Sequence, residues 1–244
     1  MRRATLLIVV ALLLVGGLGT IVIRRGTTLL YELTFNVNEP WGTEEGVWGL
    51  PACTTHGATS TYLVQHRCEE QDEDPQEGDG VFWYSGAGFD VPFYTKWCNK
   101  FDGQTEMWVR FWNYVDEVPG ENPNADILRF TNGAGCATIG SGSGYSLRLS
   151  LADLNWLLLF CDGVGQALYY TPQTWEEFLM RVNIEDGDID LWVDDFTGAP
   201  DYTCNGAGGD TATPITGFLF QSTGWDQVDE QRMDHIRVYD SDPR

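Results

Sequence analysis

The chain of 244 residues carries 14 basic and 36 acidic residues, which gives a formal net charge of −22. Four of the basic residues lie in the first 25 positions, so the rest of the chain holds 10 basic and 36 acidic side chains, a balance of −26. This excess of negative charge excludes nucleic acids and anionic lipid surfaces as favourable partners. The length that remains after position 25 is sufficient for one domain with a sizeable core.

An apolar segment opens the chain. Residues 4–23 contain no charged side chain, and pairs of arginines flank them on both sides. At about 1.5 Å per residue, a helix of this length spans roughly 30 Å, the thickness of the hydrocarbon core of a bilayer. We therefore expect a single transmembrane anchor over residues 1–25 and an extracytoplasmic domain over residues 26–244, on the periplasmic or extracellular side of the cell membrane. A cleaved signal peptide is the alternative, although its apolar core is usually shorter.

Alternation of apolar and polar residues predicts β-strands in the remainder of the chain. It occurs in residues 106–112, 145–151, 178–184 and 189–193. Turn signals such as Asp102-Gly103 and Asp186-Gly187 lie between these segments. The apolar run Leu154–Phe160 is typical of a strand that is buried on both sides. Many short strands at this spacing predict an all-β fold, a jelly-roll β-sandwich of two antiparallel sheets that follows the N-terminal helix.

Six cysteines follow the apolar segment: Cys53, Cys68, Cys98, Cys136, Cys161 and Cys204. On the exported side of a membrane they indicate up to three disulfides, because that compartment is oxidising. Six cysteines allow fifteen connectivities. Proximity in sequence favours Cys53 with Cys68 and Cys136 with Cys161, which leaves Cys98 with Cys204. No Cys-x-x-Cys pair is present, so a structural zinc site is not expected.

Several segments, taken in chain order, resemble the concanavalin A-like lectin/glucanase superfamily, in which two antiparallel sheets form a jelly roll. Residues 175–183 (WEEFLMRVN), a turn at Asp186-Gly187 and residues 188–195 (DIDLWVDD) are similar to a hairpin of laminin G-like domains. Residues 231–240 (QRMDHIRVYD) are similar to the closing strand of laminarinase-type glycosidases and related lyases. Residues 105–111 (TEMWVRF) with residues 124–130 (NADILRF) are similar to paired strands of those lyases. The resemblance implies a carbohydrate-binding or carbohydrate-processing sandwich.

The chain departs from the catalytic members of that superfamily. Laminarinase-type enzymes carry a Glu-x-Asp-x-x-Glu motif on one strand, which places two carboxylates at the separation that a retaining glycosidase needs. The nearest segment here, Glu185–Asp190, lacks the second glutamate and contains a turn glycine. The chain also lacks the tyrosine, histidine, arginine and glutamine pattern of alginate lyases. A non-catalytic member is therefore favoured, with a polysaccharide lyase or hydrolase as an alternative.

Indole and guanidinium groups share the polar phase of several predicted strands. The candidates for ligand binding are Trp108, Arg110, Trp112, Arg148, Arg181 and Trp192. Indole faces stack on the C–H surfaces of sugar rings, and a guanidinium binds a uronate or sulfate group bidentately. The alternative is an ordinary solvent face, on which these arginines pair with carboxylates such as Glu106 and Asp190 and the tryptophans belong to the core.

The resemblance also implies calcium as a cofactor. In the lectin/glucanase superfamily, an aspartate of the closing strand often joins a carboxylate of an early strand around this ion, which prefers oxygen ligands. By position, the candidate metal ligands are Asp234 with Glu39 or Asn38.

The sequence therefore predicts a membrane-anchored, disulfide-stabilised binding module that recognises a polysaccharide. A structural accessory subunit of a large respiratory, photosynthetic or secretory membrane complex is the main alternative. In that case the partners are other subunits, and Gly16, Gly17 and Gly19 permit close helix packing.

Overall fold

The computed structural model describes residues 26–33, 64–68, 76–77, 82–86, 93–115, 125–133, 135–140, 144–149, 156–206, 208, 213–222 and 228–244. These residues form strands, turns and bends, so the predicted all-β class is confirmed for this part of the chain. None of the described segments is a helix of the length and hydrophobicity that crossing a membrane requires. The predicted anchor, residues 1–25, lies outside the described residues.

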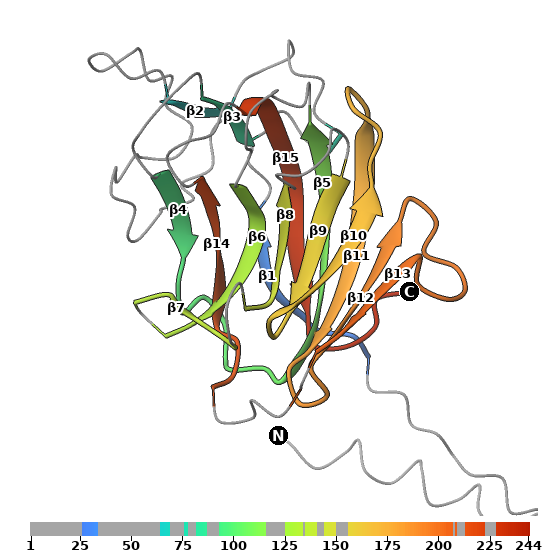
Figure 1. The fold of residues 1–244 in the computed structure, drawn as a ribbon. Helices are drawn as coiled ribbons and strands as arrows, with labels where there is room; N and C mark the ends of the chain where they lie inside the picture. The colour runs from blue at the N-terminus through green and yellow to red at the C-terminus, as the bar shows by residue number, and fades with distance from the viewer. Residues whose placement is uncertain are drawn as a thin grey trace, which may run out of the picture.

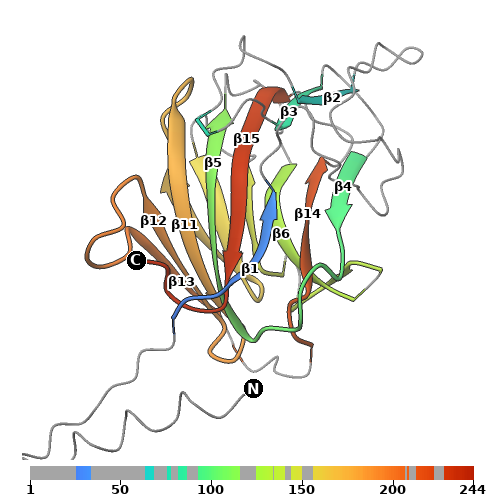
Figure 2. The same ribbon diagram turned by 180° about the vertical axis from the view of Figure 1, so that it is seen from behind.

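Two antiparallel sheets lie face to face, and Figure 2 turns the larger one toward the viewer. Among the described residues this sheet has eight strands. Their order is β13 (Tyr202–Asn205), β12 (Asp188–Val193), β11 (Trp175–Asn183), β5 (Glu106–Val115), β15 (Val228–Tyr239), β3 (Phe82–Gly86) and β2 (Val64–Cys68). The eighth strand, β1 (Leu29–Leu33), pairs with the second half of β15, and β3 pairs with the first half.

The second sheet has seven strands among the described residues and is in front in Figure 1. Their order is β10 (Val164–Tyr169), β9 (Trp156–Cys161), β8 (Ser146–Leu149), β6 (Ala125–Asn132), β14 (Gly217–Ser222) and β4 (Phe93–Trp97), with β7 (Ala137–Thr138) paired to β6. The prediction of two antiparallel sheets is therefore confirmed.

The core lies between the sheets and follows the predicted alternation. On β5 the inward side chains Met107, Val109 and Phe111 are fully buried, and Phe111 packs against Phe178 of β11 with 5.5 Å between ring centroids. Residues 154–155 lie outside the described residues. For the described strand β9 the predicted burial on both sides is wrong, because Leu158 and Phe160 are only half-buried. Strand β9 lies next to the edge strand β10, and the outer face of this sheet is not covered by another layer of described residues.

Two disulfides are present among the described residues, and both differ from the pairs favoured by sequence proximity. Cys98 pairs with Cys136, and Cys161 pairs with Cys204, with Cα–Cα distances of 5.1 and 5.9 Å. The predicted Cys136–Cys161 pair is wrong because the β9 end that carries Cys161 lies beside β13 of the other sheet, where Cys204 is its neighbour. Cys53 and the side chain of Cys68 lie outside the described residues.

Gly217 offers a test of the packing between β14 and β4. A Cβ at this position would lie 2.2 Å from the carbonyl oxygen of Trp97 and 3.0 Å from the Cα of Cys98, both of which are backbone atoms. We expect Gly217→Ala to lower the free energy of unfolding by about 1–3 kcal/mol, because the two strands must separate to accept the methyl group. Chemical denaturation with and without the substitution measures the change.

Gly135 is the matched control for this substitution. A Cβ built there meets no heavy atom within 4 Å, so Gly135→Ala should leave the free energy of unfolding within about 0.5 kcal/mol of the parent. Equal stabilities of the two variants would contradict the packing of β14 against β4.

Candidate functional site

The outer face of the eight-stranded sheet gathers five of the six predicted ligand-binding residues. Trp108, Arg110 and Trp112 project from β5, while Arg181 and Trp192 lie on the next two strands, β11 and β12. Strand register explains the grouping, since outward residues of β5 are paired with residues of its two neighbouring strands. On β11 the partners of Trp108, Arg110 and Trp112 are Arg181, Leu179 and Glu177. On β15 their partners are Tyr239, Arg237 and Asp234. Arg148 lies on β8 in the other sheet, so the structure does not bring it together with the rest.

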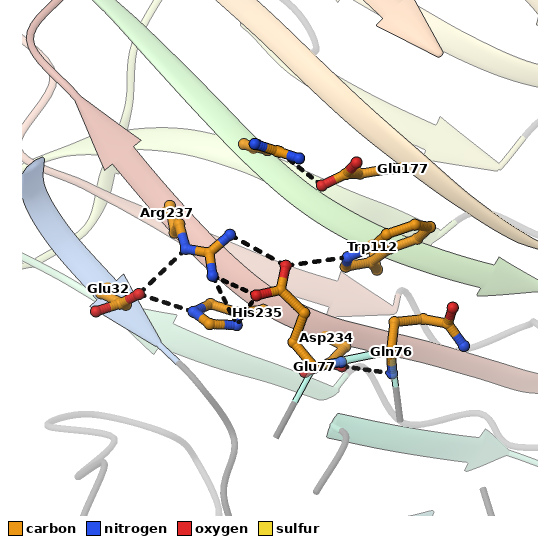
Figure 3. A network of polar contacts seen from close by, with 9 residues as sticks. Glu32, Gln76, Glu77, Trp112, Glu177, Asp234, His235 and Arg237 are labelled. Carbon is orange, nitrogen blue, oxygen red and sulfur yellow. Dashed lines mark hydrogen bonds and ion pairs between the residues drawn. The ribbon is translucent and has the colours of Figure 1, made fainter. Parts of the chain in front are cut away.

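A bulge in β15 shapes the centre of this face. Asp234 pairs with Trp112 and Arg237 with Arg110, so three steps along β15 match two steps along β5. His235 takes up the extra residue with a φ of 47°, a left-handed conformation that is uncommon for a side chain other than glycine. A bulge of this kind redirects side chains, and here it brings Asp234, His235 and Arg237 into one polar network (Figure 3).

Glu77 is the hub of that network, which Figure 3 shows from close by. Its carboxylate accepts a hydrogen bond from the Trp112 indole at 3.3 Å and from Arg237 Nη1 at 3.0 Å, and its Oε2 lies 2.8 Å from His235 Nδ1. Glu32 of β1 lies on the other side of His235 and Arg237. Its Oε1 is 2.7 Å from His235 Nε2 and accepts from Arg237 Nε at 3.1 Å. The network thus ties β1, β5, β15 and the segment 76–77 together.

The charges of this network favour the ionised carboxylates. The hydrogen bond from His235, together with Arg237, holds the pKa of Glu32 below its usual range despite partial burial. Burial acts to raise the pKa of Glu77, but the hydrogen bonds from Arg237 and the electrostatic interactions with His235 and Arg237 outweigh burial, so that the pKa of Glu77 is lowered as well. Both groups therefore remain negatively charged acceptors at neutral pH.

Asp234 anchors the segment that carries Glu77. Its Oδ2 accepts hydrogen bonds from the backbone N–H groups of Gln76 and Glu77, at 2.9 and 2.8 Å. The residue is 0% exposed, and burial raises the pKa of Asp234 to about 6, even though the two backbone donors act to lower it. Its Oδ1 is buried and has no hydrogen-bond partner among the described residues.

The structure describes one of the three predicted calcium ligands, Asp234, whereas Asn38 and Glu39 lie outside the described residues. The uncoordinated Oδ1 of Asp234 is an oxygen of the kind that calcium prefers. The described neighbours fit a cation poorly, because Glu77 is already bound to Arg237 and His235. No group of three or more His, Cys, Asp or Glu side chains in the described ranges is arranged to hold a metal. Calcium therefore stays a prediction.

The arginines of the face are paired with carboxylates. Arg110 Nε donates to Glu177 at 2.6 Å, an interaction that raises the pKa of Arg110. Arg181 bridges two carboxylates, at 2.6 Å to Glu106 and 3.0 Å to Asp190. For Arg181 the alternative interpretation of the sequence, pairing with Glu106 and Asp190 on a solvent face, is confirmed. These guanidinium groups are already engaged and do not form the open anion site that was expected.

The three predicted tryptophans differ in burial. Trp108 and Trp192 are only 5% and 3% exposed and stack on each other with 5.3 Å between ring centroids. Trp112 is half-buried at the other end of the face, next to half-buried Tyr114 and Trp175, whose ring centroids are 5.5 Å apart. The more exposed aromatic rings of this face are therefore at the Trp112 end of β5, where the guanidinium carbon of Arg232 lies 4.6 Å from the ring centroid of Tyr114.

Sequence reasoning missed the carboxylates of this site: Glu32, Glu77 and Glu177. They come from β1, from the segment 76–77 and from β11, so no local motif connects them. For Glu177 the alternation within residues 175–183 was a usable signal, because it places Glu177 on the same strand face as Leu179 and Arg181. Glu32 and Glu77 lie 203 and 158 positions before His235, at separations where a single sequence contains no pairing signal.

The chain matches no protein-family model and no curated protein sequence. Its fold is similar to that of a number of solved structures of low sequence identity, among them the following three. A protein of unknown function from Shewanella oneidensis MR-1 is 12% identical, with a TM-score of 0.47 over 90% of this chain and 91% of that chain. The carbohydrate esterase vb_24B_21 of Shiga toxin-encoding bacteriophage phi24B is 13% identical, with a TM-score of 0.49 over 88% and 99%. Domain 4 of the arabinanase AbnA from Geobacillus stearothermophilus, in complex with arabinotriose, is 10% identical, with a TM-score of 0.46 over 88% and 93%. At these identities and TM-scores, the likeness assigns neither a family nor an activity.

The buried carboxylate gives a pH-dependent prediction. Because the pKa of Asp234 is about 6 in the fold and about 3.9 in an unfolded chain, its ionisation destabilises the fold as pH rises from about 4 to 6, and the cost is complete above pH 6. In Asp234→Asn, the amide oxygen can still accept from the two backbone donors. We expect this variant to gain stability relative to the parent over that pH interval, by up to roughly 3 kcal/mol at pH 7.

Urea denaturation at pH 4, 5, 6 and 7 measures this gain, with Asp102→Asn at an exposed position as the matched control for the loss of one carboxylate. The measurement is made once in EDTA and once in calcium. If calcium binds Asp234, the parent will be more stable in calcium than in EDTA, and Asp234→Asn will lose that increment. A stability difference between variant and parent that stays constant from pH 4 to pH 7 in EDTA would contradict the uncompensated burial of this carboxylate.

Proposed function

We propose that the chain is a membrane-anchored, non-catalytic module of the lectin/glucanase type that binds a polysaccharide on the outer face of the eight-stranded sheet. The observation that carries the proposal is the surface at one end of β5, where half-buried aromatic rings lie beside oriented carboxylates. The polysaccharide is uncharged or cationic. A uronate or sulfate ligand is disfavoured because Arg110, Arg181 and Arg237 are paired with carboxylates and the chain is strongly acidic.

The aromatic part of the surface supports stacking against sugar rings. Trp112 and Tyr114 project from β5 on the same face, and Trp175 of β11 is the register partner of Tyr114. The hydrogen bond from the Trp112 indole to Glu77 fixes the orientation of that ring. Aromatic rings that are held rigidly and half-covered present one apolar face at little entropic cost, which suits the C–H surface of a pyranose.

The polar part supplies directional hydrogen bonds. Glu177 and Arg110 form a pair beside Trp112, and Glu77 with Arg237 forms a second pair on its other side (Figure 3). Each pair holds a planar acceptor and a planar donor in fixed positions, and a sugar hydroxyl both donates and accepts. The pairs are thus able to orient a sugar ring whose apolar face rests on Trp112.

The proposal of a non-catalytic role rests on how the carboxylates of the face are used. Glu177 is bound by Arg110, Glu77 by Arg237 and His235, and Asp234 by two backbone amides. A retaining glycosidase needs one carboxylate as a nucleophile and a second as an acid with a raised pKa. In Glu77 the pKa is lowered, which suits a permanent acceptor better than a proton donor.

The proposed location outside the cytoplasm is supported by the disulfides and by the leader. Cys98–Cys136 and Cys161–Cys204 are bonds that persist in oxidising compartments. The uncharged run 4–23 is long enough for a single span, and the acidic domain that follows is then exported.

Trp112→Ala tests the binding surface. We expect the full-length chain to bind neutral or amino-containing polysaccharides on a glycan array, and the substitution to weaken binding of the best ligand at least about tenfold, because a stacked ring and its oriented hydrogen bond are both lost. Isothermal titration calorimetry in detergent micelles measures the dissociation constant.

Tyr169→Ala is the matched control, since Tyr169 is an aromatic residue 63% exposed on β10 of the opposite sheet. Its loss should leave the dissociation constant unchanged. Equal weakening by both substitutions, or the appearance of unsaturated sugar ends during incubation, would overturn the proposed site or its non-catalytic role. Purification with a stoichiometric set of membrane proteins, and no glycan binding, would favour the accessory-subunit alternative.

The anchor has its own test. Each arginine placed at the centre of a membrane helix costs about 2.5–3.5 kcal/mol of insertion free energy. The double substitution of Leu12→Arg with Leu13→Arg should therefore release the protein from membranes that are washed with alkaline carbonate. Leu29→Arg, at an exposed position of β1, is the control and should stay in the pellet with the parent. Recovery of a parent chain that begins after residue 25 would show a cleaved leader instead.

A further inference from the structure

A second aromatic group lies at the opposite end of the same face, and the guanidinium group of Arg244 lies over it. Trp108 and Trp192 are stacked with an interplanar angle of 25°, and Phe196 and Tyr239 pack against them. Arg244, in the segment after β15, lies over both indoles, with its guanidinium carbon 5.1 Å from the Trp108 ring centroid and 4.3 Å from that of Trp192.

The same guanidinium group is surrounded by oxygen acceptors. Its Nη1 donates to the carbonyl oxygens of Phe196 and Gly198, at 3.2 and 3.3 Å. Its Nη2 and Nε donate to the carboxylate of Asp242, at 2.7 and 2.9 Å. The ion pair with Asp242 raises the pKa of Arg244. Every contact that the structure gives this group is with a π face, a carboxylate or a carbonyl oxygen, which is the environment of a cation receptor.

Arg244 is nevertheless held at the surface. Its side chain is 27% exposed and its carboxylate partner lies only two residues away in the same segment. Ion pairs and cation–π contacts at exposed positions are weak, because water competes for both partners. A cationic ligand with a sugar ring to lay on the indoles can therefore displace it.

We propose that the Trp108–Trp192 pair is a subsite for the ammonium group of an amino sugar, and that Arg244 occupies it in the absence of ligand. This inference rests on the proposed glycan-binding function and specifies the ligand as a polysaccharide with free amino groups. An ammonium group has three donors, which match the Asp242 carboxylate and the two carbonyl oxygens. Trp108 and Trp112 are four residues apart on the same face of β5, about 13 Å, so one oligosaccharide reaches both ends.

The experiment compares two probes of equal length, a fully deacetylated glucosamine hexamer and its N-acetylated form, titrated into the full-length chain in micelles at low and physiological salt. We expect the parent to bind the amino form more tightly. Arg244→Ala, which removes the internal competitor and keeps Asp242, should bind the amino hexamer at least about fivefold more tightly than the parent, equivalent to about 1 kcal/mol. Its affinity for the acetylated hexamer should rise by a smaller factor, since that probe gains the uncovered indole faces but has no ammonium group to replace the guanidinium of Arg244.

Arg244→Gln serves as a second variant that preserves the length of the side chain, and thermal unfolding verifies that both variants fold. Acrylamide quenching of tryptophan fluorescence should rise in both, because the two indoles lose their cover. An unchanged affinity of both variants for the amino hexamer, or an equal gain for the acetylated one, would overturn the subsite. The proposed function fails separately, by the absence of any glycan binding that depends on Trp112.

Discussion

The register shift between β15 and β5 is the constraint on which the polar face depends. If β15 had no bulge, its side chains would alternate regularly after Asp234, and the side chain of His235 would lie on the core side of the sheet. The left-handed backbone at this position costs on the order of 1–3 kcal/mol. The contacts that it permits offset the cost, because His235 reaches Glu32 of β1 and Glu77 of the segment 76–77 at the same time. One strained residue thus connects elements that are more than 150 positions apart in the chain.

Cross-strand ion pairs decide which chemistry the face can offer. An acidic chain that placed bare arginines on a sheet would attract polyanions to that place. Here Arg110, Arg181 and Arg237 each lie against carboxylates of neighbouring elements. The pairing leaves fixed donors and acceptors rather than a net positive patch, and the surrounding charge of the chain is negative. The specificity that we propose, against anionic ligands, rests on repulsion as well as on the lack of open guanidinium groups, and is thus built from an unfavourable interaction.

The strands and their faces were readable in the sequence, whereas the partners across the sheet were not. Alternation in residues 106–112 and 178–184 gave the correct inward side chains, because the pleat has a period of two wherever one face is buried. The pairing of Cys161 with Cys204 was missed because it depends on which edge strands of the two sheets meet. Arg148 was grouped with Arg110 for a similar reason: both have the polar phase of a strand, but only strand order shows that β8 belongs to the other sheet. Local periodicity contains neither strand order nor loop contacts.

Trp108 and Trp112 illustrate how far such long-range contacts determine function. They lie on one strand, in one phase, with the same kind of neighbours in sequence, so the sequence predicts the same role for both. Their different burial comes from segments that arrive from elsewhere. The segment 76–77 reaches Trp112 with a single carboxylate and leaves the ring half-exposed, while Arg244 and Phe196 cover Trp108 and its stacked partner. Remote parts of the chain thus determine how far an indole on a sheet is exposed, and the segment after β15 covers the indoles in one half of the face.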